Sequence, residues 1–329
     1  MNDIQDIKTL SSKFIAYLRV QLGSPGLDFA APLTRLQGGY ETAIYRFELD
    51  GAPAELDKPL VLRLYPSFYG TGSATWESTL QNVLASQKYP VAKAHMLCTD
   101  LSVLGGAFFI MDHLPGQTLA MALQAEVPEP LGKFHAELHN LDPAPLIAML
   151  REKGIDGDAY RLESRFDWLK SKATEQPWLH QAVDWLLEHR PPEPARLSIC
   201  HGDFHPFNIM YVDGAVSGVL DWGGFSIADP AYDIGNTLVL IAVAFRHLAA
   251  SIPGVPPIDF DRMVERYLAA YRIYRPLEDT NLDYYQVRRC VMALAQGVEG
   301  QKIWQHPLIV RDLLAFIRQV SGIQITLSK

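Results

Sequence analysis

Apolar residues change their spacing along the chain, and each change predicts a different kind of secondary structure. From about residue 4 to residue 22 they recur at helical intervals, and Gly23 and Pro25 end that predicted helix. Between residues 32 and 65 the chain instead consists of short segments rich in β-branched and aromatic residues, which predicts three strands.

Helical spacing returns from about residue 73 to residue 86, and strand-like segments follow at 95–98 and 107–111. Beyond Pro115-Gly116 nearly all of the pattern is helical, apart from residues 197–221. A segment of five strands and a helix that is followed by a helical segment predicts an α+β protein.

The chain has 329 residues, more than one hydrophobic core usually serves, so we expect two lobes. The natural boundary is the connection before Gly116. We therefore assign residues 1–113 to a small lobe of five strands and residues 114–329 to a larger, mainly helical lobe.

Charge and cysteine content narrow the class of protein. The net charge of −8 argues against a nucleic-acid or anionic-membrane partner, because both need a basic face. Three scattered cysteines supply neither a disulfide framework nor zinc spacing, and the N-terminus has no long apolar run. The longest apolar run, residues 238–245, is too short to span a bilayer. We expect a cytoplasmic protein.

The most informative segment lies between His201 and Asp221. Asp213-Gly214 separates two apolar runs, which is a strong signal for a β-hairpin. With those two residues in the turn, Asn208 faces Val219, and Asp221 lies two residues further along the same face. Diagonal neighbours of this kind are roughly 7–8 Å apart at their Cα atoms, so their side-chain oxygens can converge on one metal ion or on two adjacent ions.

These residue types suit phosphoryl transfer. A carboxylate has to accept the proton of the attacking hydroxyl group, and Asp203 lies in the loop that leads into the hairpin. Magnesium prefers hard oxygen ligands, which Asn208 and Asp221 provide.

The segment from His201 through Asp203 to Asn208 resembles the signature of the aminoglycoside phosphotransferase and choline-kinase-like family, whose members are relatives of protein kinases. The resemblance implies a bilobal protein-kinase-like fold with an antiparallel five-stranded N-lobe. It implies Asp203 as catalytic base, Asn208 and Asp221 as Mg²⁺ ligands, and Asp233 as a residue that braces the catalytic loop.

The same resemblance assigns nucleotide-binding roles in the first third of the chain. Gly38, Gly39 and Tyr40 would form the loop over the phosphates, where backbone N–H groups can approach closely. Arg63 would take the place of the strand-three lysine, with Glu77 on the next helix as its ion-pair partner.

The hinge between the lobes would comprise Met111, Asp112 and His113, whose backbone would bind the nucleotide base. The implied ligands are ATP or GTP with Mg²⁺ and a small hydroxylated acceptor. Aminoglycosides, macrolides, choline-like alcohols and homoserine-like metabolites all remain open as acceptors. A monomer and a homodimer both fit.

Several histidines have a plainer interpretation. His201 is expected to hydrogen-bond the local backbone, whereas His205 either contacts substrate or orders its loop. In the helix segment with His135 and His139 the glutamate is one position late for a zinc protease motif, so we interpret the segment as core and solvent-facing helix residues.

Two other functions stay open as alternatives. A protein kinase is disfavoured because Asp229 to Asp233 follow Asp221 almost at once, which leaves no long activation segment. A nucleotide-binding scaffold with little turnover is disfavoured because all three polar groups of the site are present.

Overall fold

The computed structural model describes residues 7–36, 42–123, 126–250 and 258–327. The chain divides into two compact units, each of which is built from more than one segment. Unit 1 takes residues 1–116, 145–155 and 212–223, and unit 2 takes residues 117–144, 156–211 and 224–329. Two later segments, residues 145–155 and 212–223, thus belong to the unit that the first third of the chain builds.

The centre of unit 1 is a five-stranded sheet in which every neighbouring pair is antiparallel, as the sequence predicts. Its order is β1-β2-β3-β5-β4. The strands are β1 (Asp28–Arg35), β2 (Ala43–Asp50), β3 (Leu60–Leu64), β4 (Ala94–Cys98) and β5 (Phe108–Asp112). Successive side chains along the central strand β3 point to opposite faces of this sheet.

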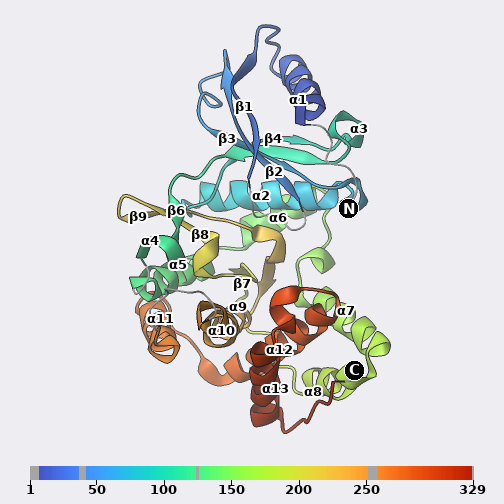
Figure 1. Ribbon diagram of the computed structural model, residues 1–329, viewed down its shortest axis with the longest axis vertical. Coiled ribbons are helices and arrows are strands. Elements are labelled where there is room, and N and C mark those ends of the chain that lie inside the picture. Colours follow the sequence, from blue (N-terminus) through green and yellow to red (C-terminus); the bar gives the residue numbers. More distant parts are fainter. Residues whose placement is uncertain (1–6, 37–41, 124–125, 251–257, 328–329) are drawn as a thin grey trace. The chain divides into compact units, whose positions relative to one another are not determined.

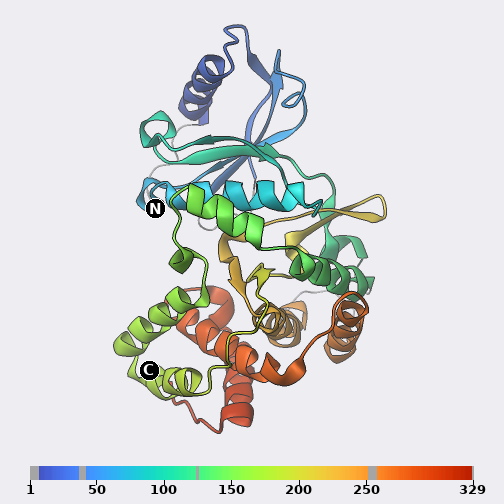
Figure 2. The ribbon, with the colours of Figure 1, turned by 180° about the vertical axis from the view of Figure 1, so that it is seen from behind.

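Helices cover both faces of this sheet (Figure 1). Helices α1 (Ile7–Gln21) and α3 (Leu101–Leu104) pack on one face, and α2 (Gly72–Ser86) packs on the other. Helix α6 (Ala144–Glu152) runs beside α2 (Figure 2). The short α3 was not predicted, because four residues are too few for a helical period to show.

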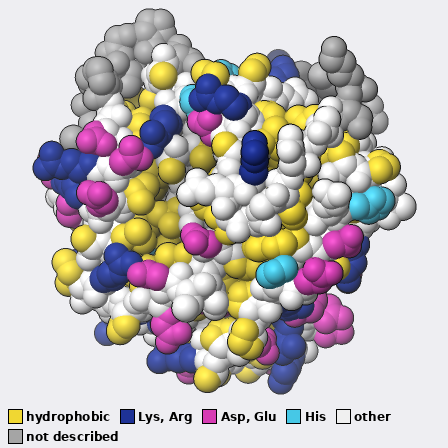
Figure 3. Space-filling view, turned by 90° about the horizontal axis from the view of Figure 1, so that it is seen from below, with side chains coloured by type: hydrophobic (Ala, Val, Ile, Leu, Met, Phe, Trp, Pro, Cys, Tyr) yellow, Lys and Arg dark blue, Asp and Glu magenta, His cyan; other side chains and the backbone are white. Residues whose placement is uncertain are grey.

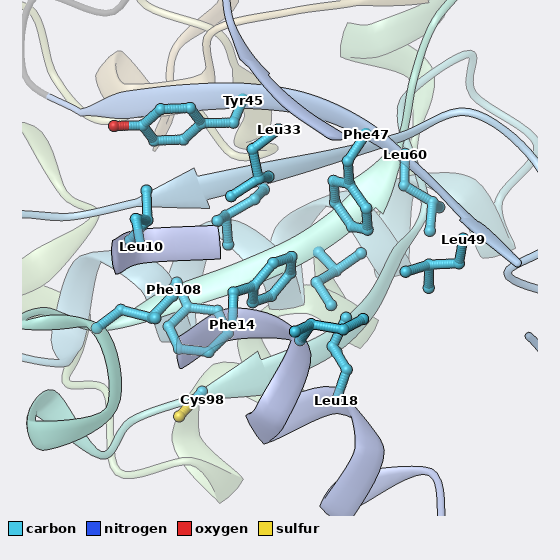
Figure 4. Close-up of a cluster of buried hydrophobic side chains, with 14 of the residues drawn as sticks. Leu10, Phe14, Leu18, Leu33, Tyr45, Phe47, Leu49, Leu60, Cys98 and Phe108 are labelled. Carbon is cyan, nitrogen blue, oxygen red and sulfur yellow. The ribbon is translucent and has the colours of Figure 1, made fainter. Parts of the chain in front are cut away.

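Leucine and aromatic side chains make the core under α1 (Figure 4). Phe14 of α1 meets the rings of Phe47 and Phe108 edge-on, with centroids 5.1 and 5.9 Å apart. Leu60 and Leu62 point into this core, and Val61 between them points into the core under α2. Each such side chain contributes roughly 1.5–3 kcal/mol when fully buried.

Unit 1 also contains a cavity of about 450 Å³ between α2, β4 and α6. Polar side chains of α2, among them Thr79 and Asn82, face apolar residues of α6 such as Met149 across it. Asn82 Oδ1 accepts a hydrogen bond from Ala94 N at 2.9 Å, which ties α2 to the start of β4.

Unit 2 is mainly helical, as predicted. Helix α5 packs along α11, and α12 packs against α9 and α13. Its helices are α4 (Leu119–Leu123), α5 (Pro128–Asn140), α7 (Leu162–Glu175), α8 (His180–Glu188), α9 (Pro230–Val239), α10 (Arg246–Ala250), α11 (Phe260–Tyr274), α12 (Leu282–Val298) and α13 (Pro307–Ser321). Two short antiparallel pairs complete it, β7 (Ser198–Cys200) with β10 (Ser226–Ala228), and β6 (Gln117–Thr118) with β8 (Ile209–Val212).

One helical run of unit 2 is long and strongly apolar. Residues Pro230–Ala250 comprise α9, a π-helical segment at Leu240–Phe245 and α10. By length and composition this run could cross a membrane, with a mean hydropathy of 1.3, but 56% of the window is buried inside the protein. A buried core helix passes the same test, and α9 packs on α12 and β7. This packing agrees with its interpretation as a core helix.

The predicted hairpin turn is present between β8 and β9 (Ala215–Val219). Asp213 and Gly214 both have positive φ, at 50° and 84°, which is the conformation that a tight two-residue hairpin requires. Asn208, however, ends the one-turn helix Pro206–Asn208 and precedes β8 by one residue. The expectation that Asn208 belongs to the hairpin ribbon is therefore wrong, because Pro206 starts a turn at that point.

Acidic and basic side chains are interspersed over the face that Figure 3 shows, with hydrophobic side chains between them. A nucleic-acid surface needs clustered basic residues. This face does not have that character.

Candidate active site

In unit 1 a buried ion pair joins β3 to α2. Arg63 Nη1 lies 3.3 Å from Glu77 Oε1, and both side chains are almost wholly buried. Tyr65, the residue that follows β3, donates its hydroxyl proton to Glu77 Oε2. Gln81 Nε2, one helical turn after Glu77, donates to Oε1 at 3.3 Å. The Arg63–Glu77 pair expected from the sequence is therefore present.

Burial and pairing act against each other in this cluster. Burial raises the pKa of Glu77 above its ordinary value, and the charge of Arg63 only partly offsets that effect. Burial disfavours the charged guanidinium of Arg63, yet the charges of Glu77 and Asp221 keep its pKa above the ordinary value. Arg63 Nε has no hydrogen-bond partner among the described residues. The guanidinium thus keeps N–H capacity for another anion.

Asp221 lies beside this pair, within the same unit. Its Oδ1 is 3.5 Å from Arg63 Nη2, while 59% of its side chain is exposed. The end of β9 is attached to the segment before β4, because Val219 N donates to Pro90 O. Within the turn after β9, Trp222 Nε1 donates to Val219 O. Asp221 has φ of 60°, an uncommon conformation for a residue other than glycine. Such outliers concentrate at functional positions.

The predicted hinge lies at the end of β5. Asp112 accepts from Lys58 Nζ at 2.7 Å and lies 2.6 Å from His95 Nε2. Its backbone N donates to Lys93 O, and the backbone N of His113 donates to Pro59 O. These two N–H groups are already used, so a nucleotide base has to bind other backbone groups of this segment. The buried side chain of Met111 packs in the core under α2.

Gly38, Gly39 and Tyr40 lie outside the described residues. Their assignment to a phosphate-binding loop stays a prediction.

In unit 2 the loop before β8 gathers three predicted site residues. His205 Nε2 lies 3.3 Å from Asp203 Oδ2 and 3.3 Å from Asn208 Nδ2. Asn208 Nδ2 also donates to Asp203 O at 3.0 Å. The amide nitrogen of Asn208 is thereby held inside the loop, and among the described residues no group donates a hydrogen bond to its Oδ1, which can accept another ligand. His205 thus contacts two other residues of this loop, and its contact with substrate stays a prediction.

The Asp203 carboxylate is ionised at neutral pH. Burial opposes ionisation, but the hydrogen bond to His205 and the charges of His205 and Arg289 lower its pKa below the ordinary value. Its side chain is 42% exposed, so a substrate hydroxyl can reach it. A carboxylate that is charged and accessible is able to accept a proton from a nearby hydroxyl group.

Asp233 at the start of α9 holds the backbone before Asp203. The backbone N–H groups of His201 and Gly202 donate to its two carboxylate oxygens, the latter at 2.8 Å. His201 Nδ1 in turn accepts from Asp203 N at 3.2 Å. These are the local backbone hydrogen bonds expected for His201 and the bracing contacts expected for Asp233.

Two histidines that the sequence left without a role also hold Asp233. His135 and His139 are fully buried on α5, and their Nε2 atoms lie 3.1 and 3.3 Å from Asp233 Oδ2. Their Nδ1 atoms pair with the hydroxyl groups of Tyr267 and Tyr271 on α11. The two His residues and Asp233 lie close enough together to hold a metal ion. Both ring nitrogens of His139 have hydrogen-bond partners, whereas His135 Nε2 lies close to Asp233 Oδ2 without forming a hydrogen bond among the described residues.

Helix α9 holds the same loop at two further points. Asn236 Nδ2 donates to Gly202 O at 3.1 Å, and Thr237 Oγ1 donates to Phe204 O at 2.8 Å. With Asp233 these contacts attach one face of α9 to residues 201–204. The conformation of the loop therefore depends on α9.

Gly202 is required at its position for two reasons. Its φ is 84°, and a Cβ atom there would lie 2.1 Å from Gly224 O. We expect Gly202→Ala to destabilise the protein by about 3 kcal/mol or more, because it adds a backbone clash to the left-handed conformation. Gly214→Ala is the matched control, since Gly214 has the same φ of 84° but nothing within 4 Å. If urea denaturation shows that the two variants lose the same free energy of unfolding, this account is contradicted.

The buried histidine pair predicts acid sensitivity. Burial lowers the pKa of His139 to about 3, and repulsion from His135 acts in the same direction. The unfolded chain binds a proton at this histidine below about pH 6.5 while the folded chain does not, so stability falls as the pH drops. We expect His139 alone to reduce the free energy of unfolding by roughly 2 kcal/mol between pH 7.5 and pH 5.

Urea unfolding at both pH values tests this, with His139→Gln as the comparison. The variant is expected to be less stable at pH 7.5 but to lose less stability on acidification. An identical pH dependence in the two proteins would exclude His139 as the source.

Comparison with known proteins places this geometry in a family. A sequence profile of the phosphotransferase enzyme family matches residues 32–279. Human acyl-CoA dehydrogenase family member 11 is 27% identical over 253 residues, which are 69% of this chain and 30% of that protein. This chain spans only 19 to 30% of the length of the curated acyl-CoA dehydrogenase relatives that it matches.

Solved structures share the fold. Macrolide 2'-phosphotransferase from Brachybacterium faecium is 17% identical, with a TM-score of 0.57 over 94% of this chain and 99% of its own. An amicoumacin kinase in complex with AMP-PNP, Ca²⁺ and Ami is 16% identical, with a TM-score of 0.62 over 97% of this chain and 96% of its own. Together with the profile match, these similarities show that the chain belongs to the phosphotransferase enzyme family and has its kinase-like fold.

Proposed function

We propose that this protein transfers the γ-phosphoryl group of ATP or GTP to a hydroxyl group of a small molecule. The observation that carries the proposal is the loop of unit 2, in which an ionised, accessible Asp203 is held beside His205 and Asn208. The hydroxyl oxygen of the acceptor would form a bond to the γ-phosphorus, while the bond between that phosphorus and the departing diphosphate breaks. Asp203 would accept the proton that the hydroxyl group loses.

Asn208 and Asp221 are the proposed magnesium ligands. The free Oδ1 of Asn208 and the exposed carboxylate of Asp221 are hard oxygen donors, which fits magnesium. When bound, the ion neutralises charge on the phosphate oxygens. The two residues belong to different units, so a shared ion stays a prediction.

Arg63 is the proposed contact for the nucleotide phosphates. Glu77 and Asp221 hold its guanidinium on β3, and its remaining N–H groups suit phosphate oxygens. Arginine offers a planar fork where a lysine would offer a point charge, so the contact favours two oxygens at once.

The acceptor is a small hydroxylated molecule. Aminoglycoside-, macrolide-, choline- and homoserine-like compounds are the first classes to test. The resemblance to acyl-CoA dehydrogenase family members adds a second class, hydroxylated acyl groups carried as coenzyme A thioesters. A protein kinase and a nucleotide-binding scaffold are the remaining alternatives.

The role of Asp221 can be tested through the magnesium dependence of transfer from γ-labelled ATP. We expect Asp221→Asn to raise the Mg²⁺ concentration for half-maximal activity at least about tenfold, because the oxygen ligand loses its negative charge. Asp213→Asn is the matched control, since Asp213 also has positive φ but lies in the hairpin turn. If the two variants need the same magnesium concentration as the wild type, Asp221 is not a ligand.

A further inference from the structure

Arg289 on α12 is a buried guanidinium without a close counter-ion. The residue is 8% exposed, and its Cζ lies 4.5 Å from the centroid of the Trp304 ring. Nη1 donates to Gln296 Oε1 at 3.1 Å. Among the described residues no carboxylate lies within 4.0 Å of its nitrogens, so both of its close partners are neutral.

This arrangement is unusual for a buried charge. Buried charged groups are generally paired with an opposite charge, because desolvation is costly. The Trp304 ring stabilises one face of the guanidinium, and Gln296 occupies one of its five N–H groups. The rest of the fork is left to bind an oxygen ligand, and a carboxyl group matches its geometry.

Arg289 and Asp203 act on the same region of unit 2. Their charges are close enough to affect each other, since Arg289 contributes to the lowered pKa of Asp203. Helix α12, which carries Arg289, packs against α9, where Asn236 holds Gly202. Asn236 Oδ1 is also buried without a hydrogen-bond partner among the described residues. Unused hydrogen-bonding groups therefore occur on two helices near the proposed base.

We propose that Arg289 binds a carboxyl oxygen of the acceptor, which makes the acceptor a hydroxylated acid or its acyl derivative. This inference rests on the proposed function and narrows its acceptor class. A guanidinium near the base repels a nearby ammonium group, so polycationic aminoglycosides and choline-like alcohols are poor substrates. The net charge of −8 does not indicate a positive charge at this position, because it describes the whole chain and not one site.

The test uses acceptors that share one hydroxylated carbon chain and differ at the other end. The ends are a carboxylate, a coenzyme A thioester, an amide and an ammonium group. For the wild type we expect the KM of the carboxylate or the thioester to be about 10- to 100-fold below that of the ammonium compound, in line with a hydrogen bond to a charged group. Comparing the carboxylate with the thioester identifies which form supplies the oxygen.

Variants of Arg289 separate acceptor binding from a structural role. We expect Arg289→Gln to raise the KM of the preferred acceptor about 10- to 100-fold, with little change in kcat or in the KM of the amide. Arg289→Lys retains the positive charge and is expected to raise that KM only several-fold. This variant replaces Arg289→Gln in the test if the latter does not fold. Arg318→Gln, an exposed arginine on α13, is the control for charge loss.

Three results would overturn the inference. They are a wild type that prefers ammonium acceptors, a variant whose KM rises equally for all acceptors, and a variant that changes none. Calorimetric titration of the hydroxy acid and of its thioester without ATP tests Arg289 independently of turnover. Binding that is lost in Arg289→Gln supports the inference even where no transfer occurs, whereas a wild type that binds neither contradicts it. Absence of transfer to every acceptor counts against the proposed function instead.

Discussion

Replacing Asp203 with Asn is expected to lower kcat by roughly 100- to 10,000-fold, the usual contribution of a general base. Asparagine fills the same volume but cannot accept the proton of the attacking hydroxyl. The Asp203 side chain is 42% exposed, so the isosteric substitution opens no cavity, and it removes only a longer-range attraction to the buried Arg289. The dissociation constant for ATP and the thermal midpoint are therefore expected to change little.

Steady-state kinetics with γ-labelled ATP measure this effect, and equilibrium binding of a nucleotide analogue is the control. A variant that has lost nucleotide binding would instead mark Asp203 as structural. A variant with wild-type kcat would exclude Asp203 as the base.

Replacing Asp233 with Asn is expected to destabilise the protein by about 3–5 kcal/mol, the range found when one partner of a buried charged network is removed. The carboxylate is fully buried and has contacts with His135, His139 and the N–H groups of His201 and Gly202. An amide has only one oxygen, so its NH₂ group would face donors. Burial disfavours the charged carboxylate, yet these histidine contacts keep its pKa well below the usual range.

A fall in the thermal midpoint of about 4–7 °C corresponds to that loss in a chain of this length. Asp184→Asn on the exposed side of α8 is the matched control, and surface changes of this kind usually stay within about 0.5 kcal/mol. Equal midpoints for the two variants would show that the network adds nothing to stability.

Features that depend on local sequence were predicted well. The Asp213-Gly214 turn and the five strands follow from turn chemistry and short-range patterns. The loop from His201 to Asn208 was found because all of its members lie within eight consecutive residues. The Arg63–Glu77 pair joins elements adjacent in the chain and was also found.

Features that depend on packing between distant helices were not predicted. His139 is 94 residues from Asp233, and His135 is 132 residues from Tyr267. Nothing in the spacing on α5 indicates which buried group its histidines meet. Arg289 was missed for the same reason, because helical spacing alone cannot show that its close partners are the neutral Gln296 and Trp304. The assignment of residues 145–155 and 212–223 to unit 1 likewise depends on tertiary contacts.

The most direct test of the central claim compares phosphoryl transfer by the wild type and Asp203→Asn, with labelled ATP, magnesium and the full acceptor set. We expect the wild type to form a phosphorylated small molecule, and Asp203→Asn to bind nucleotide but to form almost none. Equal transfer by both proteins, or no transfer by the wild type to any acceptor, would contradict the claim that this chain is a small-molecule kinase with Asp203 as its base.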